Sequence, residues 1–183
     1  MTTYRFILAA FAATVLGGSA VQAQAQAPAA APAPAAVPEV MPFDIPYGMP
    51  ISMDVAHKAI AAAAAEAKKH NWKMSISVVD PAGNLVAHAT MDGTQYASIA
   101  ISQGKARTAA QYRRPSKVFE DAANTGGRPS VLGLMALTGG APSEGGFPIV
   151  VDGKLIGAIG ASGGLSSQDA VTAKAGLEAI GSK

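Results

Sequence analysis

Two short apolar runs separated by Asp152-Gly153 constrain the fold of this chain more than any other feature. The run Pro148–Val151 precedes the pair and the run Leu155–Ala161 follows it. Asp-Gly is among the strongest short-range signals for a β-hairpin, because both central positions of the tight turn favour positive φ. The pattern therefore predicts two antiparallel strands. A helix capped by Ser166 is predicted to follow them and to run to about Ile180.

A second hairpin is predicted earlier in the chain. Met74–Val79 alternates as a half-buried strand does, a Pro-Ala-Gly-Asn turn follows, and Leu85–Met91 is the return strand. Strands that come as adjacent hairpins form an antiparallel sheet. A further short strand could lie near residues 140–143. Gly157 and Gly160 leave one side of a strand without side chains, so that another backbone or a flat ligand could approach closely.

The rest of the domain is predicted to be helical, which makes the fold class α+β, with helices covering an antiparallel sheet. Ser52 can cap the first helix, whose run of alanines has the best helix propensity, and Pro115 suits the first turn of the third. The predicted helices are Ser52–His70, Tyr96–Tyr112, Pro115 to about Ala123, and Ser130–Leu137.

Five motifs in series resemble the signatures of the GlcG/HbpS-like family, which also includes the C-terminal domain of PduO-type proteins. The motifs are SVVDPAG (Ser77–Gly83), MDG (Met91–Gly93), KARTA (Lys105–Ala109), RPS (Arg114–Ser116) and EGGFPIVVDGKLIGAIGASGGLSSQD (Glu144–Asp169). The resemblance covers roughly residues 51–180. It implies a profilin-like, five-stranded antiparallel sheet flanked by helices, assembly into higher oligomers, and haem binding, with haem degradation in some members. GlcG-type members are associated with glycolate-utilisation gene clusters.

The amino terminus has the three parts of a secretory signal peptide, predicted over residues 1–23. Arg5 gives the positive region, Phe6–Leu16 the apolar region and Val21–Ala23 a small-residue cleavage site. The apolar run of about 11 residues is short for a span, which needs about 20. Residues 24–42 form a linker rich in alanine, proline and glutamine, and residues 43–183 form the GlcG/HbpS-like domain. We therefore expect a periplasmic or secreted protein.

Composition excludes several classes of function. The chain has no cysteine, which rules out disulfides, thiolate catalysis, zinc–thiolate sites and iron–sulfur clusters. The formal net charge of +2 argues against nucleic-acid binding by phosphate neutralisation. After removal of the signal peptide, no apolar segment is long enough to be transmembrane. The domain is rich in alanine and glycine, and its first helix has small residues almost all round. Another helix could pack closely against it, so we expect a homo-oligomer.

The KARTA helix carries the first group of predicted ligand-binding residues. Lys105 and Thr108 are three residues apart and share a face, while Arg107 projects about 100° from Thr108. A lysine and a hydroxyl together can hold a carboxylate or a propionate. The alternative is that Lys105 is a solvated surface residue and that Thr108 bonds back to its own helix.

Glycine-rich segments give the second group of predicted ligand-binding residues. Glu144 precedes Gly145 and Gly146, whose backbone amides could bind an anionic oxygen. Glu144 could pair with Lys105 or Arg107, act on the ligand, or lie in a turn that merely requires glycine. Ser162 precedes two glycines at the start of the last helix, where free amides suit an anion or ordinary capping.

The basic cluster Arg113, Arg114, Lys117 and Arg128 could contact haem propionates or other carboxylates, or could be a solvated helix end.

The histidines give no obvious protein-only metal site. His57 and His70 lie on the first helix, about 20 Å apart along its axis, so they cannot share one ion within a subunit. His88 is central in a predicted strand. A haem or corrinoid needs only one axial ligand, so any single His, Met or Tyr could serve, and His88 is a weak candidate.

The sequence supports three functions. The first is an exported protein that binds a small molecule, namely haem, a corrinoid or a related anionic compound. The second is an enzyme acting on a small carboxylated or hydroxylated metabolite, with Lys105, Thr108 and Glu144 in its pocket. The third is a structural or signalling subunit without small-molecule chemistry.

Overall fold

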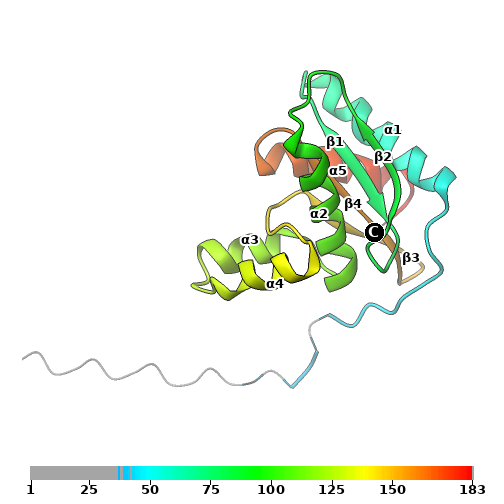
Figure 1. Cartoon of the computed structure of the whole chain (residues 1–183). Helices are drawn as coiled ribbons and strands as arrows, with labels where there is room; N and C mark the ends of the chain where they lie inside the picture. Colours follow the sequence, from blue (N-terminus) through cyan, green and yellow to red (C-terminus); the bar gives the residue numbers. More distant parts are fainter. Residues whose placement is uncertain (1–36, 38, 42, 183) are drawn as a thin grey trace, which may run out of the picture. The chain divides into compact units, whose positions relative to one another are not determined.

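Four strands form one antiparallel sheet in the part of the chain that the structure describes, with the order β2-β1-β4-β3 (Figure 1). The structure is a computed structural model, and it describes residues 37, 39–41 and 43–182. The predicted signal peptide and most of the predicted linker lie outside these residues. The strands are β1 (Ser75–Val79), β2 (Leu85–Thr90), β3 (Gly146–Val151) and β4 (Lys154–Ser162).

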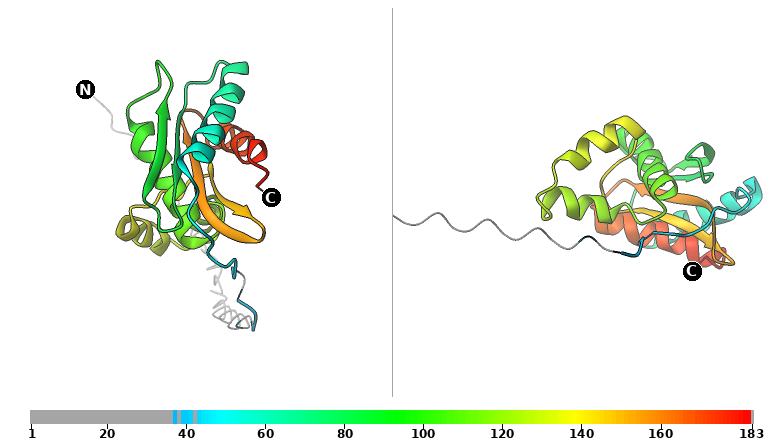
Figure 2. Two further views of the ribbon diagram at one scale, coloured as in Figure 1. Left: turned by 90° about the vertical axis from the view of Figure 1, so that its right-hand side faces the viewer. Right: turned by 90° about the horizontal axis from the view of Figure 1, so that it is seen from below.

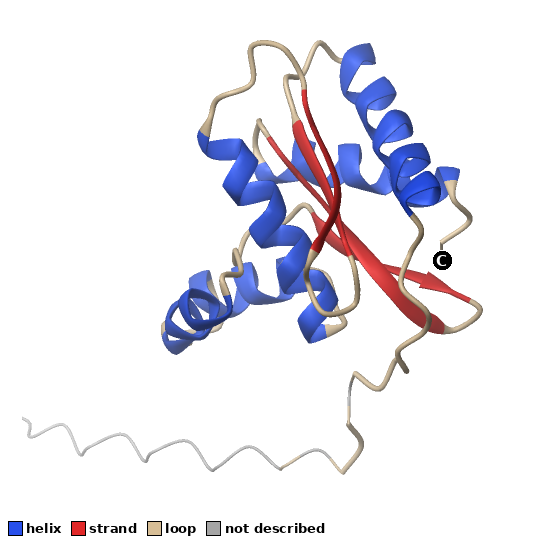
Figure 3. Ribbon diagram, turned by 45° about the vertical axis from the view of Figure 1, so that its right-hand side comes forward, coloured by secondary structure: helices blue, strands red, loops and turns tan. Residues whose placement is uncertain are grey.

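Helices cover both faces of the sheet. α1 (Met53–Lys69) and α5 (Ser166–Ala179) pack together on one face, and α2 (Ala97–Tyr112) lies across the other (Figures 2 and 3). The shorter helices α3 (Lys117–Asn124) and α4 (Ser130–Thr138) pack against each other at one end of α2. The prediction of an α+β fold with an antiparallel sheet is confirmed.

Local sequence signals account for the element boundaries. The side chain of Ser52 accepts a hydrogen bond from the Val55 amide and caps α1, as predicted. Asp152 and Gly153 have φ of 49° and 72°, as the predicted turn between β3 and β4 requires. The last helix differs in detail, because Leu165 is its N-cap residue and Ser166 is already its first helical residue.

The two faces of the sheet have different cores. On the side of α1 and α5, Ile76, Val78 and Ile159 pack against small residues such as Ala59 and Ala63. On the side of α2, Val79 and Ala158 pack against the alanines of that helix. β1 is buried along its whole length, so the prediction of a half-buried strand was wrong. It is a central strand with helices over both faces, and alternation along it separates two cores instead of core and solvent.

α2 packs directly onto the backbone of the sheet. A Cβ added at Gly160 would overlap the Ser102 carbonyl oxygen and lie 2.6 Å from the Ala106 nitrogen. A Cβ at Gly146 would overlap the carbonyl of Lys105 in the same way. The close approach predicted at Gly160 is therefore made by another backbone and not by a flat ligand.

The prediction of five strands was wrong for the described residues, which form four. Residues 140–143 are not a strand, because the Ala141 amide bonds Thr108 Oγ1 at 2.9 Å and the carbonyl of Gly104 at 3.2 Å, both on α2. Residues 46–51 do run beside the start of β4, where Tyr47 and Leu155 form an isolated parallel bridge. Pro46 and Pro50 have no amide hydrogen, which prevents a regular ladder there.

Among the described helices, none is both long and apolar enough to cross a membrane.

Candidate functional site

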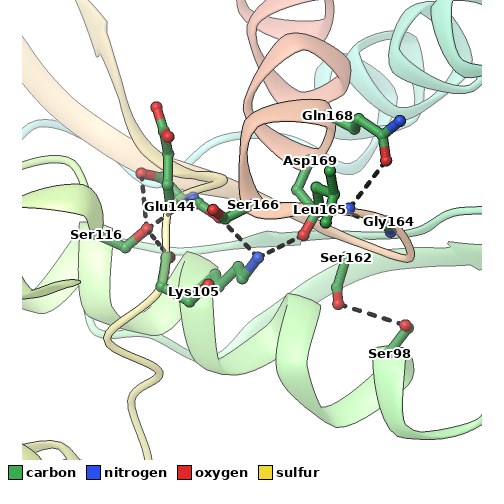
Figure 4. Close-up of polar contacts among 12 residues, drawn as sticks. Ser98, Lys105, Ser116, Glu144, Ser162, Gly164, Leu165, Ser166, Gln168 and Asp169 are labelled. Carbon is green, nitrogen blue, oxygen red and sulfur yellow. Dashed lines mark hydrogen bonds and ion pairs between the residues drawn. The ribbon is translucent and has the colours of Figure 1, made fainter. Parts of the chain in front are cut away.

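A buried ion pair joins α2 to the start of α5. Lys105 Nζ donates to Asp169 Oδ2 at 2.6 Å, and both side chains are almost wholly buried (Figure 4). Nζ also donates to the backbone carbonyl of Glu144 at 2.6 Å. The alternative that Lys105 is a solvated surface residue is wrong, because its side chain is buried, and the carboxylate that it holds in this structure is that of Asp169. The lysine instead connects three segments inside the protein.

Asp169 completes this centre from the first turn of α5. Its Oδ1 accepts a hydrogen bond from the Gly164 amide at 3.1 Å, while Oδ2 faces Lys105. Burial raises the pKa of Asp169 above its ordinary value, and the nearby ammonium of Lys105 opposes that shift. The carboxylate therefore depends on Lys105 for its charge, and the two groups act as one unit.

The segment Glu144-Gly145-Gly146 contacts Asp169 through Gly145 and Ser116 through Gly146. Gly145 has φ of 119°, and a Cβ there would lie 2.8 Å from Asp169 Cβ, so the position requires glycine. The Gly146 amide donates to Ser116 Oγ at 2.9 Å, and Ser116 Oγ donates to the Ser143 carbonyl at 2.6 Å. The Gly146 amide is thus already used within the protein. The glycine pair lies in a turn built around the ion pair, and a turn that requires glycine was one of the predicted alternatives.

Glu144 serves this centre through its backbone. Its carbonyl accepts from Lys105, and its amide donates to a carboxylate oxygen of Glu120. Among the described residues, its own carboxylate makes neither the predicted ion pair with Lys105 nor the one with Arg107, because Asp169 is the carboxylate partner of Lys105. The Glu144 side chain, drawn pointing away from Lys105 in Figure 4, is half-buried.

Thr108 and Arg107 attach α2 to neighbouring loops. Thr108 Oγ1 donates back to the Gly104 carbonyl at 2.9 Å, as the alternative interpretation predicted, and accepts from the Ala141 amide. Arg107 Nε donates to the Gly83 carbonyl at 3.3 Å and Nη1 to the Gly139 carbonyl at 3.0 Å. These contacts link the β1–β2 turn and the loop after α4 to one helix.

A network of hydroxyl groups surrounds His88 between the sheet and α2. Its Nδ1 lies 2.9 Å from Ser77 Oγ and its Nε2 lies 2.8 Å from Thr90 Oγ1. Ser77 Oγ also lies 2.9 Å from Ser102 Oγ, and Thr90 Oγ1 lies 3.0 Å from Ser75 Oγ. Burial lowers the pKa of His88, and each ring nitrogen already has a hydroxyl partner. Binding a metal through His88 would require one of these two bonds to be exchanged.

The other predicted metal and anion positions make contacts of their own, although Ser162 lies opposite Ser75 of this network on the neighbouring strand. Ser162 Oγ lies 3.3 Å from Ser98 Oγ on α2, in the interior. His70 Nε2 lies 3.0 Å from Glu66 Oε1, and its ring stacks on Trp72. Within the described part of the chain, no three His, Asp or Glu side chains are grouped so that they could hold a metal ion.

The basic cluster divides into different environments. Arg113 Nη1 donates to the Ile45 carbonyl at 3.1 Å and lies 4.0 Å from the carboxylate of Asp44. Lys117 pairs with Asp121 on the exposed surface of α3. Arg128 is exposed. Arg113 also lies over one aromatic ring, that of Tyr47, with its Cζ 5.4 Å from the centroid. Arg114 differs from the other three, because its guanidinium lies near three aromatic rings.

The predicted ligand-binding residues thus fall into separate places. Lys105, Gly145 and Gly146 meet around Asp169, while Arg107 faces the loops and Ser162 lies beside Ser98. Sequence reasoning missed three contributors, namely Asp169, Ser116 and the aromatic partners of Arg114. The signals available for the first two were only an acidic residue in the first helical turn and the serine of the RPS motif, and neither names a partner.

Comparisons with known proteins agree with the fold and the motifs. A family model described as "Haem degrading protein HbpS-like" matches residues 51–178. Protein GlcG of Escherichia coli K12 is 46% identical over 108 residues, which cover 59% of this chain and 78% of GlcG.

Two solved structures are similar over most of their length. One is a double mutant of Streptomyces reticuli HbpS, with a TM-score of 0.66 and 28% identity over 82% of this chain and 97% of that one. The other is the PduOC–haem complex, with a TM-score of 0.68 and 25% identity over 74% of this chain and 98% of that one.

Proposed function

Because the chain belongs to the HbpS-like family, we propose that it is an exported protein that binds haem. The observation that carries this proposal is the family match over residues 51–178 together with the similarity of the fold to a haem complex. Haem is preferred to a corrinoid, because a haem complex is among the similar solved structures and the matching family model is described by haem.

The residues at the end of α2 and on α4 fit a haem in two respects. Arg114 has no carboxylate partner in the ion pairs of the described residues, and its buried Nε has no hydrogen-bond partner, so its positive charge is unpaired. α4 exposes apolar side chains, which suit the body of a porphyrin. His88 is not part of this fit, because its hydroxyl network reaches α2 at Ser102, about 15 Å along the helix from the end at which Arg114 lies. Haem, when bound, would supply an iron centre with ligand-binding and redox chemistry.

Titration of the purified protein with haem tests this proposal. We expect the Soret band to shift and to saturate at a defined stoichiometry at micromolar haem. Mass-action binding should also raise the melting temperature in proportion to the logarithm of the free haem concentration. A spectrum that changes linearly without saturation, with an unchanged melting temperature, would contradict haem binding.

Export is the second part of the proposal, supported by the positive, apolar and small-residue regions of residues 1–23. We expect the protein recovered from the periplasmic or secreted fraction to begin near Gln24 or Gln26. Amino-terminal sequencing or intact-mass measurement distinguishes this from the full chain. Recovery of a cytoplasmic protein that begins at Met1 or Thr2 would show that residues 1–23 are not removed.

A further inference from the structure

Arg114 lies in a cage of aromatic side chains at the end of α2. Its Cζ is 4.0 Å from the centroid of the Phe43 ring, 4.8 Å from that of Phe119 and 5.9 Å from that of Tyr112. Phe119 and Tyr112 contact each other with their centroids 4.7 Å apart. The three rings come from separate segments, namely the stretch before α1, the first half of α3 and the end of α2. The fold therefore brings the cage together around one guanidinium.

The charge of Arg114 is not balanced by an acidic partner within the described residues. Its Nε is buried without a hydrogen-bond partner, and its side chain takes part in none of the ion pairs found there. The neighbouring Arg113 shows the contrast, because it uses Ile45 and Asp44. Burial lowers the pKa of Arg114, although arginine stays protonated at any physiological pH. The protein thus keeps a partly desolvated cation with unused donors.

The shape of this group determines what it can bind. A guanidinium is planar, and its N–H donors point outward in its plane. The rings near Arg114 lie within cation–π distance of its Cζ. A carboxylate matches such a donor edge with two parallel hydrogen bonds. The residue is only half-buried, which leaves part of the side chain open to a ligand.

We propose that Arg114, with Phe43, Phe119 and Tyr112 around it, is the binding site for a propionate carboxylate of the tetrapyrrole. This inference rests on the proposed haem binding and assigns a part of that site. It assigns the contact with the ligand carboxylate to Arg114 and not to Lys105, because Lys105 already has an internal carboxylate partner.

Apolar surface for the rest of the ligand adjoins the cage. Phe119 packs with Val131 and Met135 of α4 in one cluster, which Tyr112 also contacts. α4 then turns Leu132 and Leu134, about half exposed, toward solvent. A molecule with an acidic edge and a broad apolar body would match a cation at one side of this lobe and aliphatic side chains at the other.

The test compares haem with haem dimethyl ester, in which both propionates are neutral, by absorption titration of the purified protein. The wild type should bind haem about tenfold more tightly than the ester, or more, as expected for a hydrogen bond between charged groups. Arg114→Gln should lose about that factor for haem and should bind haem and the ester equally. Arg128→Gln, which changes an exposed arginine after α3, is the matched control and should behave as the wild type.

Each outcome separates the two proposals. If the wild type binds neither compound, haem binding itself is wrong and the assignment of Arg114 fails with it. If the wild type binds both compounds equally, or if Arg114→Gln keeps the preference for haem, haem binding stands and the assignment is overturned. The comparison in the wild type needs no variant, so it decides the matter even if a thermal melt shows Arg114→Gln to be unfolded.

Discussion

Lys105 and Asp169 show how a charged pair can hold a small domain together. The lysine is on α2 and the aspartate on α5, and the pair lies under the glycine turn that leads into β3. Burying two charges is costly, and removal of one partner leaves the other uncompensated in the interior. The pair therefore makes the junction of three segments sensitive to a single substitution.

We expect Asp169→Asn to destabilise the protein by about 3–5 kcal/mol, because it leaves the Lys105 ammonium buried without its counter-charge. The amide would also be a poorer acceptor for the Gly164 amide. Denaturant unfolding measures the change. Asp121→Asn, which breaks the exposed pair with Lys117, is the control and should leave the midpoint nearly unchanged. Equal stabilities of the two variants would show that the buried pair does not support the fold.

His88 should make stability depend on pH. Burial puts its pKa in the folded protein below the ordinary value of about 6.5 that applies to the unfolded chain. Protonation therefore favours the unfolded state, and this contribution to stability is present above pH of about 6.5 and is lost as the pH falls toward the pKa of the folded state.

The measurement is the melting temperature between pH 7.5 and pH 5, in wild type and variants. His88→Gln can keep hydrogen bonds to Ser77 and Thr90 without titrating, so its melting temperature should fall less over this range. His57→Gln changes an exposed histidine and should follow the wild type. If both variants follow the wild type, His88 is not the group responsible.

At the scale of elements, α2 is the helix on which the site depends. It contributes Lys105, and it rests on glycines of β3 and β4, so that its backbone nearly touches theirs. This packing sets the depth of Lys105 and hence its distance from Asp169. A side chain inserted between helix and strand should separate the pair.

We expect Gly160→Ala to destabilise the protein by about 3 kcal/mol, because the new methyl group meets backbone atoms of Ser102 and Ala106 that cannot rotate away. Gly133→Ala in α4 is a matched control, since a Cβ there has no atom within 4 Å. That control should stabilise the protein by about 0.5–1 kcal/mol through helix propensity. The denaturant midpoints of the two variants test both expectations. Equal shifts of the two midpoints would disprove the close contact between Gly160 and the backbone of α2.

At the scale of the whole molecule, the surface of α4 is unusually apolar. Leu132, Leu134 and Leu137 are 54%, 50% and 85% exposed on a helix of nine residues. Isolated exposed leucines are ordinary, but a group on one short helix marks an interaction surface. Leu132 and Leu134 are assigned above to the haem, which leaves Leu137, the most exposed of the three, for contact with a second subunit. The small residues predicted to favour contacts on α1 have another role here, because Ala59, Ala63 and Ala67 are buried within the subunit.

We expect the purified protein to be a homo-oligomer. Light scattering should give a mass of at least two subunits, with four to eight as the expected range. Leu137→Glu should lower this mass, because it puts a charge into the apolar surface of α4. Leu165→Glu changes a leucine that is 70% exposed outside α4 and should leave the mass unchanged. A monomer at tens of micromolar would disprove the oligomer.

The order of the helices and the two hairpins could be predicted from the sequence, because each depends on local chemistry. Asp152-Gly153 sets a turn, Ser52 caps a helix, and alternation marks the strands. The five motifs identified the family for the same reason, since they are strings of neighbouring residues. These signals need no knowledge of what lies across the molecule.

Partnership between distant residues was decided only by the tertiary structure. Lys105 and Asp169 are 64 positions apart, and nothing near Lys105 in the sequence distinguishes a buried lysine from a solvated one. Arg114 likewise meets Phe43 only because the stretch before α1 returns to the end of α2. Whether a side chain is buried, and which partner it meets, depends on which backbones approach each other in space. For Lys105, the close approach of α2 to the glycines of the sheet decides both.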